Sequence, residues 1–138
     1  MDRATARRLI ERLNLDAERL AGRFGLRYQS ITAERAGVRS RYGVCYADGA
    51  IKIRLRHATT GLPLKYSSLV NTLCHELAHL RHFNHGPRFK AFYFEILEHA
   101  RVQRIYRPGR PQVVVARLPA PPPVRRSAPS PQQLSLFG

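Results

Sequence analysis

The residues best suited to chemistry lie in one short run, His75–His79, which reads H-E-L-A-H. Residues four apart on an α-helix lie one turn apart on the same face, so the imidazoles of His75 and His79 can reach a single metal ion. A catalytic zinc site takes a third protein ligand and leaves a fourth position for water. His85 follows six residues after His79, where a turn can bring it back. The pattern predicts a divalent metal site, with one Zn²⁺ as the favoured ion.

Glu76 supplies the acid–base chemistry that such a site needs. Zinc lowers the pKa of a bound water from 15.7 toward roughly 7, and a neighbouring carboxylate can take the proton and pass it to a leaving amine. An unpaired Glu and His in a strongly apolar helix would be costly to bury, which favours a working site. An oxyanion donor is also expected, and the spacing leaves open Tyr42, Tyr46 and Tyr66.

Spacing alone leaves the third ligand open. His85 is favoured, and the alternatives lie on the next expected helix, namely Glu95, Glu98 and His99. His82 follows His79 by three residues and is expected outside the ligand set. The two cysteines, Cys45 and Cys74, are expected to be small buried hydrophobic residues rather than ligands.

Composition limits the class of protein. The chain has 138 residues, 43% of them hydrophobic, and a formal net charge of +15. That length allows one modest core, and the charge favours nucleic acid or another polyanion as a partner. Two cysteines exclude a disulfide scaffold. No apolar run approaches the ~20 residues of a membrane helix, and the first residues lack the apolar segment of a signal peptide, so we expect a cytoplasmic protein without membrane contact.

Apolar periodicity predicts three helices. The first spans the N-terminal segment and ends at Gly22 or Gly25, with arginines between its apolar residues. The second covers residues 67–83, carries the histidines and buries a stripe of leucines. The third begins at Pro87, because proline suits the first helical turn, and continues through Ala100.

Short segments rich in β-branched and aromatic residues predict strands over residues 28–34, 39–47 and 50–56. Asp48-Gly49 between the last two is a signal for a two-residue hairpin turn. In the third segment, isoleucine and leucine alternate with Lys52, Arg54 and Arg56, which predicts a half-buried strand with a basic outer face. Helices and strands together predict an α+β fold.

The block 31–89 resembles the SprT-like and YgjP-like zinc metalloproteases. In those families an Arg-aromatic-Gly-x-Cys element on a small β-meander precedes the H-E-x-x-H helix, and here 41–45 reads R-Y-G-V-C. The family segment N-H-G/S-x-x-F follows the helix, and here 84–89 reads N-H-G-P-R-F. The resemblance implies a small antiparallel β-meander, His75, His79 and His85 as ligands, and Glu76 as the catalytic acid/base. The chain departs from the families in Tyr42, where Trp is common, and in lacking cysteines for a C-terminal zinc ribbon.

The composition changes after Glu98, the last acidic residue. Residues 112–117 are a candidate strand, and six of the ten prolines lie in 118–138, which predicts a disordered tail after a domain of 1–117. The tail ends in an apolar peptide that resembles the Q-L-S/D-L-F motif for the bacterial sliding clamp. Packing on the chain's own domain and a degradation signal are the competing interpretations. The peptide consists of Gln133, Leu134, Ser135, Leu136 and Phe137.

These features favour a zinc metalloprotease acting on DNA-associated, even DNA-crosslinked, proteins in the bacterial nucleoid and recruited to the sliding clamp. DNA would be held without sequence preference by basic side chains. Two alternatives remain: a metal-dependent nucleotide phosphohydrolase of the kind assigned to some YgjP-like relatives, and a non-enzymatic DNA- and clamp-binding module with structural zinc. The expected nucleic-acid contacts are Arg101, Arg104, Arg107 and Arg110.

Overall fold

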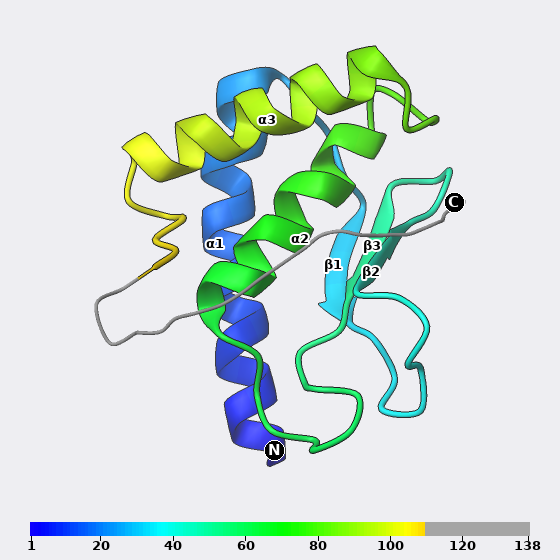
Figure 1. The fold of residues 1–138 in the computed structure, drawn as a ribbon, viewed down its shortest axis with the longest axis vertical. Helices are drawn as coiled ribbons and strands as arrows, with labels where there is room; N and C mark the ends of the chain where they lie inside the picture. The colour runs from blue at the N-terminus through cyan, green and yellow to red at the C-terminus, as the bar shows by residue number, and fades with distance from the viewer. Residues whose placement is uncertain (110–138) are drawn as a thin grey trace.

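Three helices and one small sheet make up residues 1–109, the part of the chain that the computed structural model describes (Figure 1). This arrangement confirms the α+β class. None of the helices in this part is both long and apolar enough to cross a membrane. The elements in chain order are α1 (Arg3–Phe24), β1 (Ser30–Ala33), β2 (Gly43–Cys45), β3 (Ala50–Ile53), α2 (Tyr66–His79) and α3 (Pro87–Val102).

Helix α1 has both of its ends defined by the sequence. The side chain of Asp2 accepts a hydrogen bond from the backbone N–H of Thr5 at 2.8 Å, which satisfies a free donor of the first turn. Gly25 ends the helix in the left-handed conformation with φ 68°, so the expected end at this glycine is confirmed. The fully buried Leu13 and Leu20 fix the inner face of α1 in the core.

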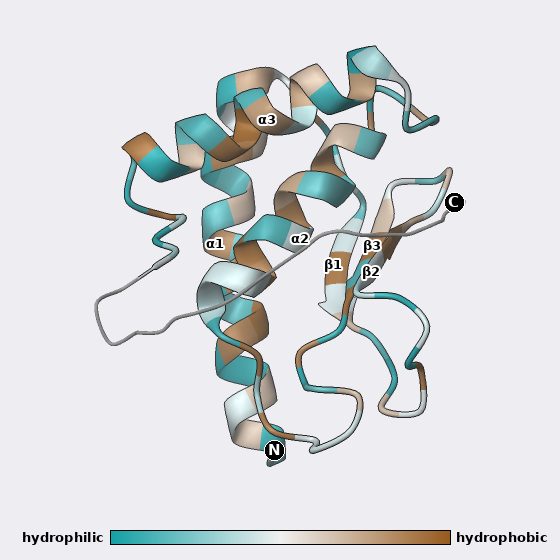
Figure 2. Cartoon of the chain, viewed as in Figure 1, coloured by the Kyte–Doolittle hydropathy of each residue, from teal (hydrophilic) through white to brown (hydrophobic). Residues whose placement is uncertain are grey.

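The core lies between the three helices and the face of the sheet that α1 and α2 cover. Helix α2 is central, since it packs on α1, α3, β2 and β3. Its buried stripe includes Leu69, Leu73 and Leu77, each with no exposed area. Figure 2 shows polar residues interleaved with these apolar ones on α2. The helix is therefore anchored along one side and leaves other positions to the site.

The sheet is mixed, with strand order β1-β3-β2, so the expected antiparallel β-meander is wrong. Strand β3 pairs in parallel with β1, with Ile31 opposite Ile51, and antiparallel with β2, with Gly43 opposite Ile53. The reason is burial. Ile51 and Ile53 are fully buried, whereas the residues of β2 are only partly buried, so β3 takes the central position with a neighbouring strand at each edge.

The turn between β2 and β3 has three residues, 47–49, enclosed by the pair Tyr46 and Ala50, rather than the expected two. Gly49 N–H donates to Tyr46 O at 2.9 Å, and Tyr46 N–H donates to Ala50 O at 2.8 Å. This pattern is a type I turn followed by a bulge, which requires a positive φ at its last residue. Gly49 provides it with φ 93°.

Arg54 does not belong to an exposed basic face, because the 34–42 loop covers it. Only 7% of the residue is exposed. Its Nη1 donates to the carbonyl oxygens of Arg39 at 3.0 Å and Arg41 at 3.4 Å, and its guanidinium lies 4.4 Å from the ring centroid of Tyr42. A cation can be buried only with such acceptors, so Arg54 fixes the loop that leads into β2.

The start of the same loop is held by an ion pair. Glu34 is buried, and its Oε2 accepts hydrogen bonds from Nε and Nη2 of Arg41 at 3.0 and 2.7 Å. Both donors reach the same carboxylate oxygen, and hydrogen bonds between two charged groups are stronger than those between neutral ones. Arg41, the first residue of the R-Y-G-V-C element, therefore has a structural role.

We predict that Glu34→Gln lowers the free energy of unfolding by about 1–3 kcal/mol, because a buried acceptor of a charged donor is weakened. Glu98→Gln is the matched control, since Glu98 also pairs with an arginine through two hydrogen bonds but is exposed. Urea denaturation of both variants measures the difference. Equal losses would contradict a structural role for the Glu34–Arg41 pair.

Candidate metal centre

The helical spacing places two imidazoles side by side. His75 and His79 lie one turn apart on α2, and their ring centroids are 4.9 Å apart. The leucine stripe of α2 is buried in the core, and this fixes the direction in which the two rings project. Between them in sequence, Glu76 is only 4% exposed. The helix thus presents two imidazoles and one buried carboxylate.

His85 joins this pair because α2 ends earlier than expected. The helix stops at His79 rather than at residue 83, and the next N–H groups bond three residues back, Leu80 to Leu77 and Arg81 to Ala78. This tighter turn redirects the chain. Nε2 of His85 then lies 2.8 Å from Nε2 of His79. One ligand atom from each histidine lies within 4.8 Å of the others.

The donor chemistry fits a metal cation. Nδ1 of His79 lies 3.1 Å from the carbonyl oxygen of His82 and donates to it, which leaves the Nε2 lone pair directed at His85. Burial lowers the pKa of His79, and burial with the neighbouring histidines lowers the pKa of His85 to about 3. Both imidazoles are therefore favoured in their neutral form, the form in which a histidine nitrogen can give its lone pair to a divalent cation.

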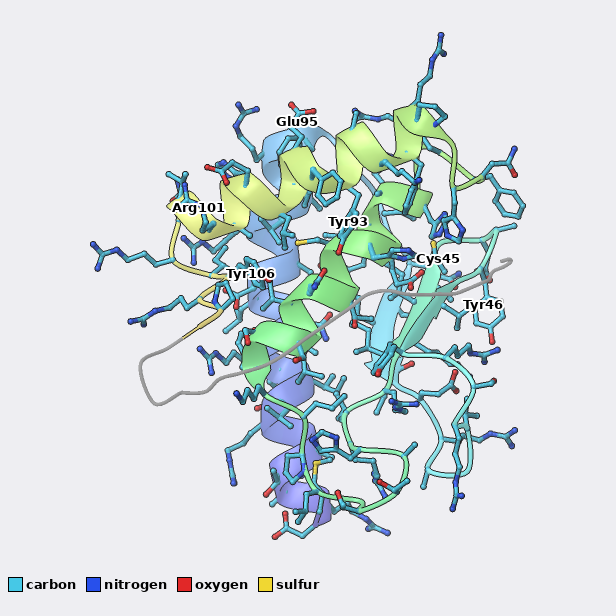
Figure 3. The ribbon with its side chains drawn as sticks, in the orientation of Figure 1. Cys45, Tyr46, Tyr93, Glu95, Arg101 and Tyr106 are labelled. Carbon is cyan, nitrogen blue, oxygen red and sulfur yellow. The ribbon has the colours of Figure 1, made fainter. Side chains whose placement is uncertain are left out.

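Helix α3 covers the imidazoles with aromatic rings. Phe89 is 3% exposed, and its ring centroid lies within 4.4–4.9 Å of all three imidazole centroids. The Tyr93 ring lies 5.4 Å from that of His75, and its hydroxyl donates to Asn71 (Figure 3). The sequence motifs include Phe89 only as the last residue of the N-H-G-P-R-F segment, and they do not include Tyr93. Phe89 and Tyr93 are four residues apart and therefore lie on the same face of α3. This spacing is the sequence signal that could have predicted an aromatic cover over the histidines.

Strand β2 passes so close to α2 that no side chain fits at position 43. A Cβ on Gly43 would lie 2.7 Å from Cγ2 of Thr72 and 3.2 Å from Oε2 of Glu76. The same Oε2 lies 3.3 Å from Nδ1 of His75. The glycine of the R-Y-G-V-C element is therefore what lets the sheet enclose the carboxylate.

Residues 1–105 match the family model described as the YgjP-like metallopeptidase domain. The chain belongs to this family. A comparison with curated protein sequences found no match. The fold is also similar to that of Wss1 from Saccharomyces cerevisiae, with a TM-score of 0.65 and 19% identity over 70% of this chain and 77% of the other. Wss1 from S. pombe gives a TM-score of 0.61 and 22% identity over 72% and 86%.

The alternative ligands of this YgjP-like metallopeptidase lie apart from the histidine group. Glu95 is exposed on α3, Glu98 pairs with Arg101, and the His99 ring packs against Phe24 (Figure 3). His82 packs against Phe92 and gives its carbonyl oxygen to His79. Among residues 1–109, His75, His79 and His85 are the one group of His, Cys, Asp or Glu side chains close enough together to hold a metal ion.

The three tyrosines considered for oxyanion stabilisation are distributed over the surface. Tyr66 donates to Asp16 at 2.6 Å at the start of α2, and Tyr42 covers Arg54. Tyr46 lines a cavity together with His79. Cys74 is buried in the core as expected, and Cys45 is half-buried. Burial, together with the nearby Glu76, raises the pKa of Cys45 to about 12.

The sites predicted beyond the histidines are only partly described. Arg101 is exposed in the last turn of α3 and pairs with Glu98. Arg104 and Arg107 are exposed in the chain that follows α3. Arg110, the candidate strand, the predicted disordered tail and the peptide Gln133–Phe137 lie outside the described residues.

We predict that Gly43→Ala destabilises the protein by about 1–3 kcal/mol, because the added methyl must displace Thr72 or Glu76. Gly37→Ala is the control, since a Cβ at position 37 meets nothing within 4 Å. Urea denaturation gives the stabilities, and peptide hydrolysis reports the displacement of Glu76. A Gly43→Ala protein as stable and active as Gly37→Ala would contradict the close packing of β2 on α2.

Proposed function

We propose that this metallopeptidase uses one Zn²⁺ held by His75, His79 and His85, with Glu76 as the general base and acid. The observation that carries the proposal is the convergence of three imidazole nitrogens within 4.8 Å beside a buried carboxylate. Three protein ligands leave a coordination position open, as catalytic zinc sites do and structural ones do not. When bound, zinc supplies a Lewis acid that polarises a carbonyl and makes water a nucleophile near neutral pH.

The protein's own residues divide the remaining work. Glu76 accepts the proton that the attacking water loses and delivers it to the leaving amine nitrogen. The His82 carbonyl keeps His79 in one tautomer, so its Nε2 remains a ligand atom. Phe89 shields the imidazoles from water on the α3 side. A low-dielectric surrounding of this kind strengthens each charge interaction at the site.

We predict that Glu76→Gln lowers the rate of protein cleavage by about 10²–10⁴-fold, because the proton acceptor is lost. Zinc content, measured by elemental analysis, should stay at one ion per chain, whereas His85→Ala should lose the ion. Glu95→Gln is the control, because Glu95 is an exposed carboxylate of α3.

The assay uses a protein substrate on DNA, the same protein without DNA, and nucleoside triphosphates. Full activity in Glu76→Gln would contradict the mechanism. Hydrolysis of triphosphates alone would favour the phosphohydrolase alternative. Added salt should abolish any preference for the DNA-bound substrate, since phosphate contacts weaken with salt.

We further propose that the substrates are proteins on DNA. The support is the net charge of +15 and its distribution. After Glu98 the sequence has seven arginines and no acidic residue. A cavity of about 530 Å³ at the start of α2 is lined by Arg12, Lys65 and Arg107, among others. These cations lie away from the histidines, so they suit phosphates of DNA that carries the substrate.

The C-terminal peptide suggests where the enzyme is sent. Gln133 offers hydrogen bonds, and Leu136 and Phe137 offer apolar anchors, a combination suited to the pocket of a sliding clamp. Recruitment would concentrate the peptidase near replication or repair sites on the nucleoid.

We predict that removal of residues 132–138 abolishes binding to the bacterial sliding clamp in a pull-down and leaves cleavage of free protein unchanged. Leu136→Ala with Phe137→Ala should act like the truncation, while Ser130→Ala, just before the motif, should bind normally. Clamp binding by the truncated chain would remove the peptide from the proposal.

A further inference from the structure

A second cavity, of about 230 Å³, lies directly beside His79. One wall is the β2–β3 turn, with Cys45, Tyr46 and Ala47, and the other is the end of α2 and the chain after it, with Leu80 and Phe83. Figure 3 shows Cys45 and Tyr46 at the turn end of the sheet. We call this space the hairpin cavity. It shares His79 with the histidine group, so anything bound there lies next to the metal ligands.

The lining of the hairpin cavity is mostly apolar. Arg81 also borders it, but the Arg81 guanidinium is engaged elsewhere: Nη2 donates to Phe24 O at 2.6 Å, and Cζ lies 4.2 Å from the ring centroid of Phe92. The Cys45 thiol stays neutral because burial raises its pKa. No carboxylate lines the cavity. A cationic side chain would find no carboxylate there, and the Arg81 guanidinium faces Phe24 O and the Phe92 ring, whereas an apolar side chain would lose contact with water.

Two large side chains remain exposed at the border of the hairpin cavity. Phe83 is 76% exposed and Tyr46 is 42% exposed. They come from opposite walls, one after α2 and one from the hairpin turn. Exposed aromatic side chains that gather at a cavity indicate a ligand that covers them.

The volume of the hairpin cavity limits its occupant to one side chain. A cavity of about 150 Å³ holds benzene, so about 230 Å³ holds one leucine, methionine or phenylalanine side chain but not two. A folded protein or a lipid tail would not enter such a space. A single side chain of an extended polypeptide would.

We propose that the hairpin cavity is a specificity subsite that binds one uncharged apolar side chain of the polypeptide substrate, next to the bond that is cleaved. The proposal rests on the peptidase function proposed above. Because His79 belongs to both sites, the bound side chain lies within one or two residues of the scissile bond. Phe83 and Tyr46 are the specificity-determining residues, since they close the cavity over that side chain.

The test is cleavage of a mixed peptide library by the full-length zinc-loaded enzyme in the presence of DNA, with cut sites read by mass spectrometry. The wild type should prefer Leu, Met or Phe over Gly or Ala by about 10–100-fold at one position flanking the cut. Phe83→Ala and Tyr46→Ala should each reduce that ratio severalfold, with the ratio taken for each variant from paired peptides that differ only at this position. Leu62→Ala is the control, since Leu62 is 61% exposed in a loop that does not border the cavity.

The two proposals fail in different ways. If the zinc-loaded wild type cuts no peptide and no protein, the peptidase mechanism fails. If it cuts without an apolar preference, or if Phe83→Ala and Tyr46→Ala match Leu62→Ala in selectivity, the hairpin cavity is not a subsite while the mechanism stands. Both side chains are exposed, so their truncation leaves the core intact, and thermal melting of each variant verifies this.

Discussion

The close approach of β2 to α2 is the constraint on which most of the structure depends. It is possible only because position 43 has no side chain, and it encloses the Glu76 carboxylate between helix and strand. The position of β2 is fixed by the 34–42 loop that precedes it. The Glu34–Arg41 pair and Arg54 both hold this loop through hydrogen bonds. The same placement brings the β2–β3 turn to the end of α2, where the hairpin cavity forms. The contact of Gly43 with α2 thus determines the surroundings of Glu76 and of the side chains that line the hairpin cavity.

The sequence predicted the helices and the histidine cluster well, because both depend on local periodicity. Gly25 and Pro87 are local signals for helix ends, and H-E-x-x-H fixes its own geometry once the helix forms. Pairing of strands is not local. Nothing in residues 30–53 states that β3 takes the centre, since that follows from how Ile51 and Ile53 meet the helices. Tertiary contacts therefore determined the order of the strands. The local signal at Asp48-Gly49 correctly predicted a hairpin of β2 and β3, although the turn is longer than two residues.

The local sequence pattern also did not predict that Arg54 is buried or that α2 ends at His79. An arginine that alternates with isoleucine is normally exposed, and only the 34–42 loop folded over it changes that. Leucine and phenylalanine after His79 extend the helical pattern to residue 83, yet the chain turns at Leu80. The aromatic cover of the imidazoles is a further case, since Phe89 faces both the core and the site.

All three imidazoles of the centre come from residues 75–85, so the group closes a very short loop. The entropy lost on closing such a loop is small, and one helical turn with the following bend suffices to build it. The wall around Glu76 needs a strand that lies some thirty residues earlier in the chain and pairs through nonlocal contacts, which form more slowly. The imidazole group therefore depends on contacts that are local in sequence, whereas the enclosure of the carboxylate depends on contacts between distant parts of the chain.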